Sequence, residues 1–375
     1  MDDPRSLLAD LVAIDSVNPS LVPGGAGEAE IARFVAGWLE QRGLDVEMAD
    51  AEPGRPNVVA RAAGSGGGRT LLLNAHMDVV GGEGMTDPFR PRIEGDRLYG
   101  RGAYDMKAGL AAIMVAAARA AERDLAGDVL VAAVCDEEFA SAGAQAVVRT
   151  VQADAAIVTE PTGEQMTIAI AHKGFTWHEI VVAGHAAHGS RPQDGVDAIA
   201  RMGHVLVAIE QLADRLAAGA GHPLLGPGSV HAAIIDGGRE LSSYPDSCRL
   251  QLERRTLPGE TVEVVEAELS ALLDGIRDAG HDLQAELRTT LVRDPFEVDP
   301  HAAIVQAARD ALGRDLPVIG VPFWADSAIF AGAGIPTVIF GPGGEGAHAA
   351  VEWVDLVQLD RCVEALEQVI GSFCA

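Results

Sequence analysis

Hydrophobic and polar positions follow two different periods along this chain of 375 residues. Between residues 6 and 42 the apolar residues recur at helical spacing, which predicts two helices that end before Gly43. Further on, predicted strands (NVVARA, RTLLLNAHMDVV, DVLVAAVC and AAIVTE) alternate with predicted helices at residues 106–123 and 142–151. This alternation predicts an α/β fold, with a mostly parallel sheet covered by helices on both faces.

The pattern changes near Lys173. There FTWHEIVVAG alternates strictly between apolar and polar residues, SVHAAIIDGG and SCRLQLERRT are also predicted strands, and helices are predicted at residues 197–217 and 260–279. These elements predict a smaller α+β sandwich at residues 174–290. Beyond it, HAAIVQAARDALG and PTVIFGPG return to helix and buried strand. We therefore expect one domain made of residues 1–173 and 291–375, into which the sandwich is inserted.

The charge of the chain narrows the classes of partner. With 28 Lys and Arg against 55 Asp and Glu, the formal net charge is 28 − 55 = −27, and only two residues are lysines, Lys107 and Lys173. Binding to nucleic acid or to an anionic membrane needs clustered basic residues, so we expect neither partner. The N-terminus is acidic and the longest apolar stretch, residues 108–118, is too short to cross a bilayer, which predicts a cytoplasmic protein. Four widely spaced cysteines argue against a disulfide framework and against a thiolate zinc site.

Residues that could bind metal ions or transfer protons follow the predicted buried strands. In an open α/β sheet, sites form at the carboxyl ends of the strands. Five separate segments bring imidazoles or carboxylates to this edge: His76 with Asp78, Asp105, Glu137 with Glu138, Glu160, and His348. Each has an ordinary alternative role, since Asp105 could cap the following helix and an acidic pair is often a solvated helix start. Their shared position at one edge favours a common site.

Two imidazoles and several carboxylates, without thiolates, suit a pair of divalent ions such as zinc, with manganese or cobalt as alternatives. One carboxylate would bridge the two ions, which would share a water molecule, acidify it and polarise a carbonyl. A further carboxylate would act as general base, and another would orient a ligating imidazole. The residues alone therefore predict metal-assisted hydrolysis.

Six strings in this order carry a family resemblance: NAHMDVV, GRGAYDMKAG, VCDEEFASAGA, VTEPTG, GHAAHGSRPQDGVDAI and FGPGGEGAHAAVEWV. They resemble the dinuclear zinc amidohydrolase and peptidase family that includes acetylornithine deacetylase, succinyl-diaminopimelate desuccinylase, aminoacylase and glutamate carboxypeptidase. The resemblance extends from the N-terminal helices to Trp353. It implies a metal-binding catalytic domain at residues 1–173 and 291–375 and a lid and dimerisation domain at residues 174–290.

The resemblance also implies roles for the candidate residues. Asp105 would bridge both ions, and a cis peptide would join it to Met106. Asp78 would hydrogen-bond the ligating imidazole, and Glu137 would be the general base for a hydroxide that bridges the metals. The remaining ligands would be His76 and Glu160 on the first ion, and Glu138 and His348 on the second.

In the inserted domain, the resemblance makes His188 the imidazole that reaches across a homodimer to stabilise the oxyanion, with His185 as the rival. Arg255 would hold a substrate carboxylate, although an exposed sheet cation would look the same in the sequence. Ser242 stands where many relatives carry Asn, which changes a substrate contact. Trp324, in PFWADSA, is expected near the substrate or in the core.

The function that follows is metal-dependent hydrolysis of an amide bond in an N-acyl amino acid, with a dipeptidase or carboxypeptidase as the alternative. A catalytically silent binding protein on this fold is disfavoured by the complete set of ligands. The string GPGGEG satisfies a dinucleotide-binding pattern, but Pro342 and His348 interrupt the helix that this pattern requires. There is also neither a phosphate-binding loop with its lysine nor the G-x-S-x-G turn of serine hydrolases.

Overall fold

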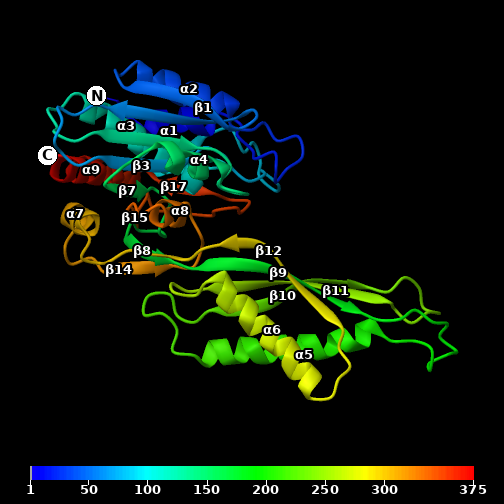
Figure 1. Cartoon of the computed structure of the whole chain (residues 1–375). Helices are drawn as coiled ribbons and strands as arrows, with labels where there is room; N and C mark the ends of the chain where they lie inside the picture. Colours follow the sequence, from blue (N-terminus) through cyan, green and yellow to red (C-terminus); the bar gives the residue numbers. More distant parts are fainter. Residues whose placement is uncertain (1) are drawn as a thin grey trace. The chain divides into compact units, whose positions relative to one another are not determined.

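A computed structural model describes residues 2–375. The chain divides into two compact units, and Figure 1 shows the elements of each. The first unit consists of Met1–Ile170, Val298–Ile319 and Ala325–Ala375, and the second of Ala171–Glu297 and Gly320–Trp324. The assignment of residues 174–290 to a lid and dimerisation domain stays a prediction.

The first unit is built on a mixed sheet whose central strands are parallel. Their order is β6 (Val129–Val134), β3 (Leu71–His76), β7 (Ala155–Val158) and β15 (Thr337–Ile339). Antiparallel strands continue the sheet on both sides: β2 (Arg55–Ala62) and β1 (Asp45–Glu52) beside β6, and β8 (Ile168–His172) beside β15. All residues of β3, β6 and β7 are buried, as expected for strands covered on both faces.

Two groups of helices cover this sheet. On one side α3 (Ala108–Ala121) packs against α1 (Pro4–Val12), α9 (Leu356–Phe373), β3 and β6, and α9 also contacts α7 (Ala303–Leu312). Helix α2 (Ala29–Glu40) packs on β1 and β2 and also contacts α3, whereas another group contains α4 (Ala142–Thr150), which contacts α8 (Ser327–Gly332). The predicted α/β class is therefore confirmed, with parallel pairing concentrated in the four central strands.

The helix that follows Asp105 begins later than predicted. Residues Ala103–Lys107 form a separate π-type turn, η1, in which Asp105 and Met106 have non-helical dihedral angles and are joined by a cis peptide bond. The α-helix then starts at Ala108. Gly109 in its first turn lies so close to the residue after β7 that a Cβ there would overlap the carbonyl oxygen of Thr159.

A small antiparallel sheet was not predicted. Its order is β16 (Gly344–Glu345), β17 (Trp353–Asp355), β5 (Arg97–Tyr99) and β4 (Arg92–Glu94). The strands have only two or three residues each, too few to produce a clear alternation of apolar and polar positions. This sheet joins the segment before η1 to the segment that contains His348.

The second unit contains a four-stranded antiparallel sheet and two long helices. The strand order is β10 (Ser229–Gly237), β11 (Ser247–Thr256), β9 (Gly174–Ala183) and β12 (Ala285–Arg293). The helices are α5 (Ala198–Ala218) and α6 (Val262–Asp278), and both pack on the sheet. Alternate residues of β9 and β11 enter a core shared with these helices, which explains the strict two-residue alternation in the sequence. Strand β12 extends to Arg293, beyond the predicted boundary at residue 290.

The junctions near the second unit are formed by short strands. Strand β13 (Phe296–Glu297) pairs with the last residues of β8, and β14 (Val318–Val321) also pairs with β8. The four cysteines are buried and free. Among residues 2–375, none of the helices combines the length and the hydropathy that a membrane span requires.

Candidate metal centre

The central parallel strands deliver the candidate ligands to one edge of the sheet. His76 is the last residue of β3, Glu137 and Glu138 follow β6, and Glu160 follows β7. His348 follows β15, and Asp105 belongs to η1, just before α3. Because the carboxyl ends of parallel strands share one edge, residues that are far apart in the sequence meet there.

Asp105 lies between the two imidazoles. Its Oδ1 is 3.3 Å from Nε2 of His76, and its Oδ2 is 3.1 Å from Nε2 of His348. One carboxylate therefore presents one oxygen to each imidazole, which is the arrangement that a bridging ligand of two ions needs.

Each imidazole also has a carboxylate of its own. Nε2 of His76 is 3.6 Å from Oε1 of Glu160 and 4.0 Å from Oε2 of Glu137. On the other side, Nε2 of His348 is 3.0 Å from Oε2 of Glu138. The structure thus brings together all five predicted ligands and the predicted general base.

This donor set fits a pair of divalent ions. Donor atoms of His76, Glu137 and Glu160 lie within 4.8 Å of one another, and so do those of His76, Asp105 and Glu138. Imidazole nitrogens with carboxylate oxygens suit zinc, and they also suit manganese or cobalt. Because both groups include His76, whose Nε2 binds one ion, a second ion needs the other imidazole, His348, which lies 3.0 Å from Glu138 and 3.1 Å from Asp105.

Protons occupy the same cluster when no cation is bound. Burial raises the pKa of Glu137 and of Glu160 well above their usual range. Hydrogen bonds donated to Asp105 and Glu138 raise the pKa of His348 to about 10. Ligands must lose their protons to bind metal, so uptake of cations at neutral pH would release protons from this cluster.

Two residues at the site have left-handed backbone conformations. Asp136, which precedes Glu137, has φ of 66°, and His348 has φ of 60°. Such conformations are uncommon outside glycine and persist only where neighbouring contacts determine them. These conformations set the direction of the backbone just before Glu137 and at His348.

Asp78 lies beside His76 and also accepts hydrogen bonds from backbone amides. Nδ1 of His76 is 2.9 Å from the backbone oxygen of Asp78 but 3.7 Å from its carboxylate. The carboxylate accepts hydrogen bonds from the backbone N–H groups of Glu137 (3.1 Å) and Glu138 (3.2 Å), and from Nδ2 of Asn18 (2.7 Å). Asp78 therefore holds the start of the acidic segment.

Further buried residues support this segment, and the sequence analysis missed them. Asn18 also donates to Asp136, whose carboxylate is paired with Arg55, and Arg55 forms an ion pair with Glu28. Asn18, Glu28 and Asp136 are at most 1% exposed. Asn18 and Glu28 come from the N-terminal segment and Arg55 from β2, where no motif was noted, and an Asn before a proline is the one visible signal there. Asp136 lies in the string VCDEEFASAGA, directly before the acidic pair.

The other predicted site residues belong to the second unit. His188 is exposed, and its Nδ1 lies 2.8 Å from the hydroxyl of Ser190. The adjacent Gly189 donates its N–H to the backbone oxygen of Ser242 at 2.7 Å. His188 and Ser242 thus lie on neighbouring segments of this unit, and their catalytic and substrate-binding roles remain predictions.

Arg255 and Trp324 also have contacts within the second unit. Nε of Arg255 donates to Glu253 at 2.7 Å, and its guanidinium lies 4.8 Å from the ring centroid of Phe175. The indole of Trp324 donates to the backbone oxygen of Asp294 at 3.0 Å. These contacts hold both side chains in place, and a role for either in substrate binding remains a prediction.

The sheet edge and its donor set have the form of a metal-dependent hydrolase site. The sequence profile of Peptidase family M20/M25/M40 matches residues 72–372. The chain belongs to this family, and the resemblance noted from the six strings is confirmed.

Two curated relatives cover nearly the whole chain. Acetylornithine deacetylase of Myxococcus xanthus is 30% identical over 99% of this chain and 97% of that protein. The N-formyl-4-amino-5-aminomethyl-2-methylpyrimidine deformylase of Bacillus subtilis (strain 168) is 29% identical over 92% of this chain and 89% of that protein.

Solved structures share the fold. Aminopeptidase PepT from Bacillus cereus superimposes with a TM-score of 0.81 at 21% identity, over 99% of this chain and 98% of that one. A dinuclear metal-binding peptidase of the M20 family from Bacillus subtilis gives a TM-score of 0.77 at 20% identity, over 99% of this chain and 97% of that one.

Proposed function

We propose that this enzyme removes a short acyl group from the nitrogen of an N-acyl amino acid. The observation that carries the proposal is the position of Asp105, which presents one oxygen to His76 and the other to His348. The names of the two curated relatives support the acyl class, since one is a deacetylase and the other a deformylase.

The ligands that we propose are His76 and Glu160 for one ion, Glu138 and His348 for the other, and Asp105 for both. Zinc is the ion that we propose, with cobalt or manganese as substitutes. Two divalent ions bound there would lower the pKa of a water molecule and polarise the substrate carbonyl.

Glu137 is the general base in this proposal. Burial raises the pKa of its carboxyl group, so it can hold a proton that it has taken from water and pass it to the leaving amine. Asp78 fixes the backbone of Glu137 through its N–H group, at 3.1 Å. The base is thereby kept within reach of the reacting water while its neighbour, Glu138, remains a ligand.

The second unit would supply the remaining contacts. We propose that His188 stabilises the oxyanion, that Arg255 binds the substrate carboxylate, and that Ser242 and Trp324 line the substrate site. His188 would act on the partner's site in a homodimer formed through the inserted domain. A cytoplasmic location also remains a prediction.

Glu137→Ala tests the assignment of the base. We expect turnover to fall by several orders of magnitude, while the metal content remains near two ions per chain, because the five proposed ligands are unchanged. Metal analysis and a hydrolysis assay on one preparation check this result. Retained activity in the variant would overturn the role of Glu137. Apo-protein that hydrolyses substrate as fast as zinc-restored protein would overturn the metal mechanism.

A di- or carboxypeptidase is the second candidate, supported by the peptidases among the solved structures of this fold. A substrate panel distinguishes the two. With zinc present, we would compare N-acetylornithine, N-succinyl-diaminopimelate, other N-acyl amino acids and dipeptides. Preference for dipeptides over every N-acyl amino acid would refute the deacylase assignment.

A further inference from the structure

Glu352 holds the turn that contains Asp105. Its Oε1 accepts hydrogen bonds from the backbone N–H groups of Tyr104 (2.9 Å) and Asp105 (3.0 Å). Its Oε2 accepts from the N–H of Gly102 (3.0 Å) and from Nη1 of Arg101 (2.7 Å). Four donors from one stretch of five residues therefore converge on a single carboxylate.

The same carboxylate belongs to the segment that carries His348. Arg101, which pairs with Glu352, also donates through Nη2 to the backbone oxygen of Ala349 at 3.1 Å. Arg101 further donates through Nε to the backbone oxygen of Gly81, at 3.0 Å. The pair therefore joins the Asp105 turn, the His348 segment and the segment beyond β3.

Burial makes this arrangement more than a surface ion pair. Arg101 is 2% exposed and Glu352 is 1% exposed. A buried ion pair gains little net stability, because desolvation offsets most of the attraction. Both oxygens of Glu352 are instead used to fix backbone positions, and an acid that is fully hydrogen-bonded in this way specifies a conformation.

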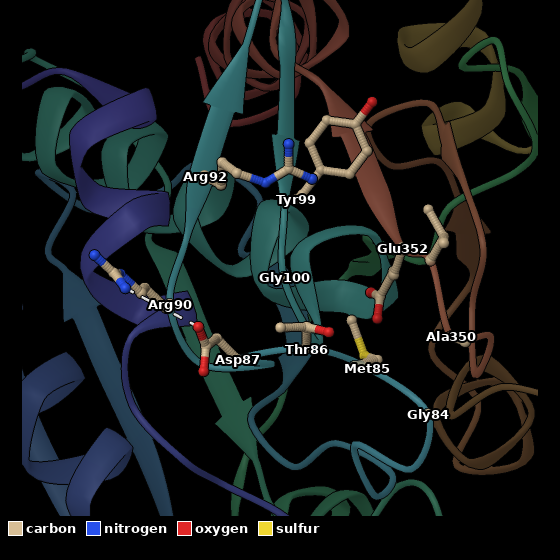
Figure 2. A pocket seen from close by; sticks show the side chains of 11 residues that line it. Gly84, Met85, Thr86, Asp87, Arg90, Arg92, Tyr99, Gly100, Ala350 and Glu352 are labelled. Carbon is tan, nitrogen blue, oxygen red and sulfur yellow. Dashed lines mark ion pairs between the residues drawn. The ribbon is translucent and has the colours of Figure 1, made fainter.

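Glu352 also borders a cavity of about 290 Å³ that Tyr99, Gly100 and the segment from Gly84 to Asp87 line (Figure 2). Its carboxylate is nevertheless turned to the Asp105 turn, as the four hydrogen bonds require. The residue therefore acts inside the protein rather than on a molecule in that cavity.

We propose that Glu352 is a positioning residue that sets the spacing between Asp105 and His348, and thereby the affinity for the second metal ion. This inference rests on the proposed dinuclear function. It assigns to Glu352 no contact with metal or substrate, since it acts through the backbone of the Asp105 turn and through Arg101.

Glu352→Gln is the direct test. The amide keeps one acceptor oxygen, but its nitrogen faces donors on the other side, so part of the turn is released. We expect the dissociation constant of one of the two zinc ions to rise about 10–100-fold, the usual effect of losing a residue that orients a ligand. Competition with a chelator measures this constant, and the absorption spectrum of the Co²⁺-loaded protein reports the ligand geometry.

Glu260→Gln is the matched control. Glu260 accepts a hydrogen bond from Nη2 of the buried Arg254 and another from the backbone N–H of Leu257, both at 2.7 Å, in the second unit. The Glu260→Gln variant should have a lower thermal stability and unchanged dissociation constants for both zinc ions. If Glu352→Gln likewise changes only thermal stability and leaves both zinc constants at their wild-type values, the inference is wrong.

Two further outcomes remain decisive. If Glu352→Gln does not fold, Glu352→Asp replaces it, because the shorter acid keeps the charge beside Arg101 but cannot reach both ends of the turn. A wild-type zinc constant in Glu352→Asp would then refute the positioning role. Wild-type protein that binds fewer than two ions would refute the proposed dinuclear function itself, which separates the two failures.

Discussion

Asp78→Asn provides a stringent test of how the acidic segment is held. The resemblance to the family assigns this carboxylate to His76, yet the carboxylate lies 3.7 Å from Nδ1 of that imidazole. Its close partners are the N–H groups of Glu137 and Glu138 and the amide of Asn18. We therefore expect the substitution to act mainly on Glu137 and Glu138.

The magnitude follows from the three hydrogen bonds. The carboxylate uses both oxygens, Oδ1 for Glu137 and Oδ2 for Glu138 and Asn18. An Asn side chain keeps two bonds if its nitrogen faces the N–H of Glu137, and fewer if it is flipped. The expected loss is one hydrogen bond to a charged group, worth about 1.5–3 kcal/mol, together with a buried N–H that has lost its acceptor. The metal-free variant should therefore be destabilised by roughly 2–4 kcal/mol.

Denaturant unfolding of the metal-free protein measures this loss, and zinc competition measures its effect on the site. We expect zinc affinity to fall about 10–100-fold. Asp355→Asn is the control, because Asp355 also accepts two backbone N–H groups, but through a single oxygen at the start of α9. An Asn caps a helix nearly as well as an Asp, so the control should change little. The reasoning fails if the free energy of unfolding of Asp78→Asn lies within about 0.5 kcal/mol of the wild-type value. A change of that size is typical of a neutral surface substitution.

Two further predictions concern α3 and the residue before it. Gly109→Ala should lower the free energy of unfolding by about 1–3 kcal/mol, because its Cβ would overlap the backbone at Thr159. Gly37→Ala in α2 is the control: a Cβ there has nothing within 4 Å, so the substitution should raise the free energy of unfolding by up to about 1 kcal/mol. Equal effects in denaturant unfolding would contradict this view of the contact. Burial lowers the pKa of Lys107 from 10.5 to about 7. Between these values the unfolded chain binds more protons than the folded one, so stability should rise with pH across this window. Lys107→Met should flatten that rise in unfolding experiments at pH 7, 8.5 and 10, and an unchanged slope would exclude Lys107 as its source.

Much of the candidate site could be predicted because its residues follow strands with a strong apolar pattern. His76 ends a strand that is buried in the sheet, Glu137 and Glu160 closely follow two others, and the parallel order then fixes the edge on which they meet. The sequence did not reveal the residues that hold these ligands. Asn18 and Glu352 act through backbone groups of distant segments, and such contacts leave no periodic trace in the sequence.

The fold was predicted best where elements are long. Helix α5 and strands β9 and β11 carry clear periods, and they lie close to their predicted ranges. The small sheet of β16, β17, β5 and β4 was missed, because strands of two or three residues are defined by their partners rather than by their own pattern. The late start of α3 has another origin: Met106 and Lys107 are residues that favour helices, although the backbone is not helical at Asp105 and Met106.

The order of the central sheet has a consequence for synthesis of the chain. Strand β15, which begins at Thr337, lies between β7 and β8, and β8 ends at His172, 337 − 172 = 165 residues earlier. At about 5–20 residues per second, the ribosome needs roughly 8–33 s to synthesise these residues, and during this time β7 and β8 lack the strand that lies between them. Unpaired strand edges recruit other chains, so we expect products that end before Thr337 to aggregate. A single stretch, residues 337–348, then fills the sheet and delivers His348, so that maturation of the sheet and of the metal centre coincide.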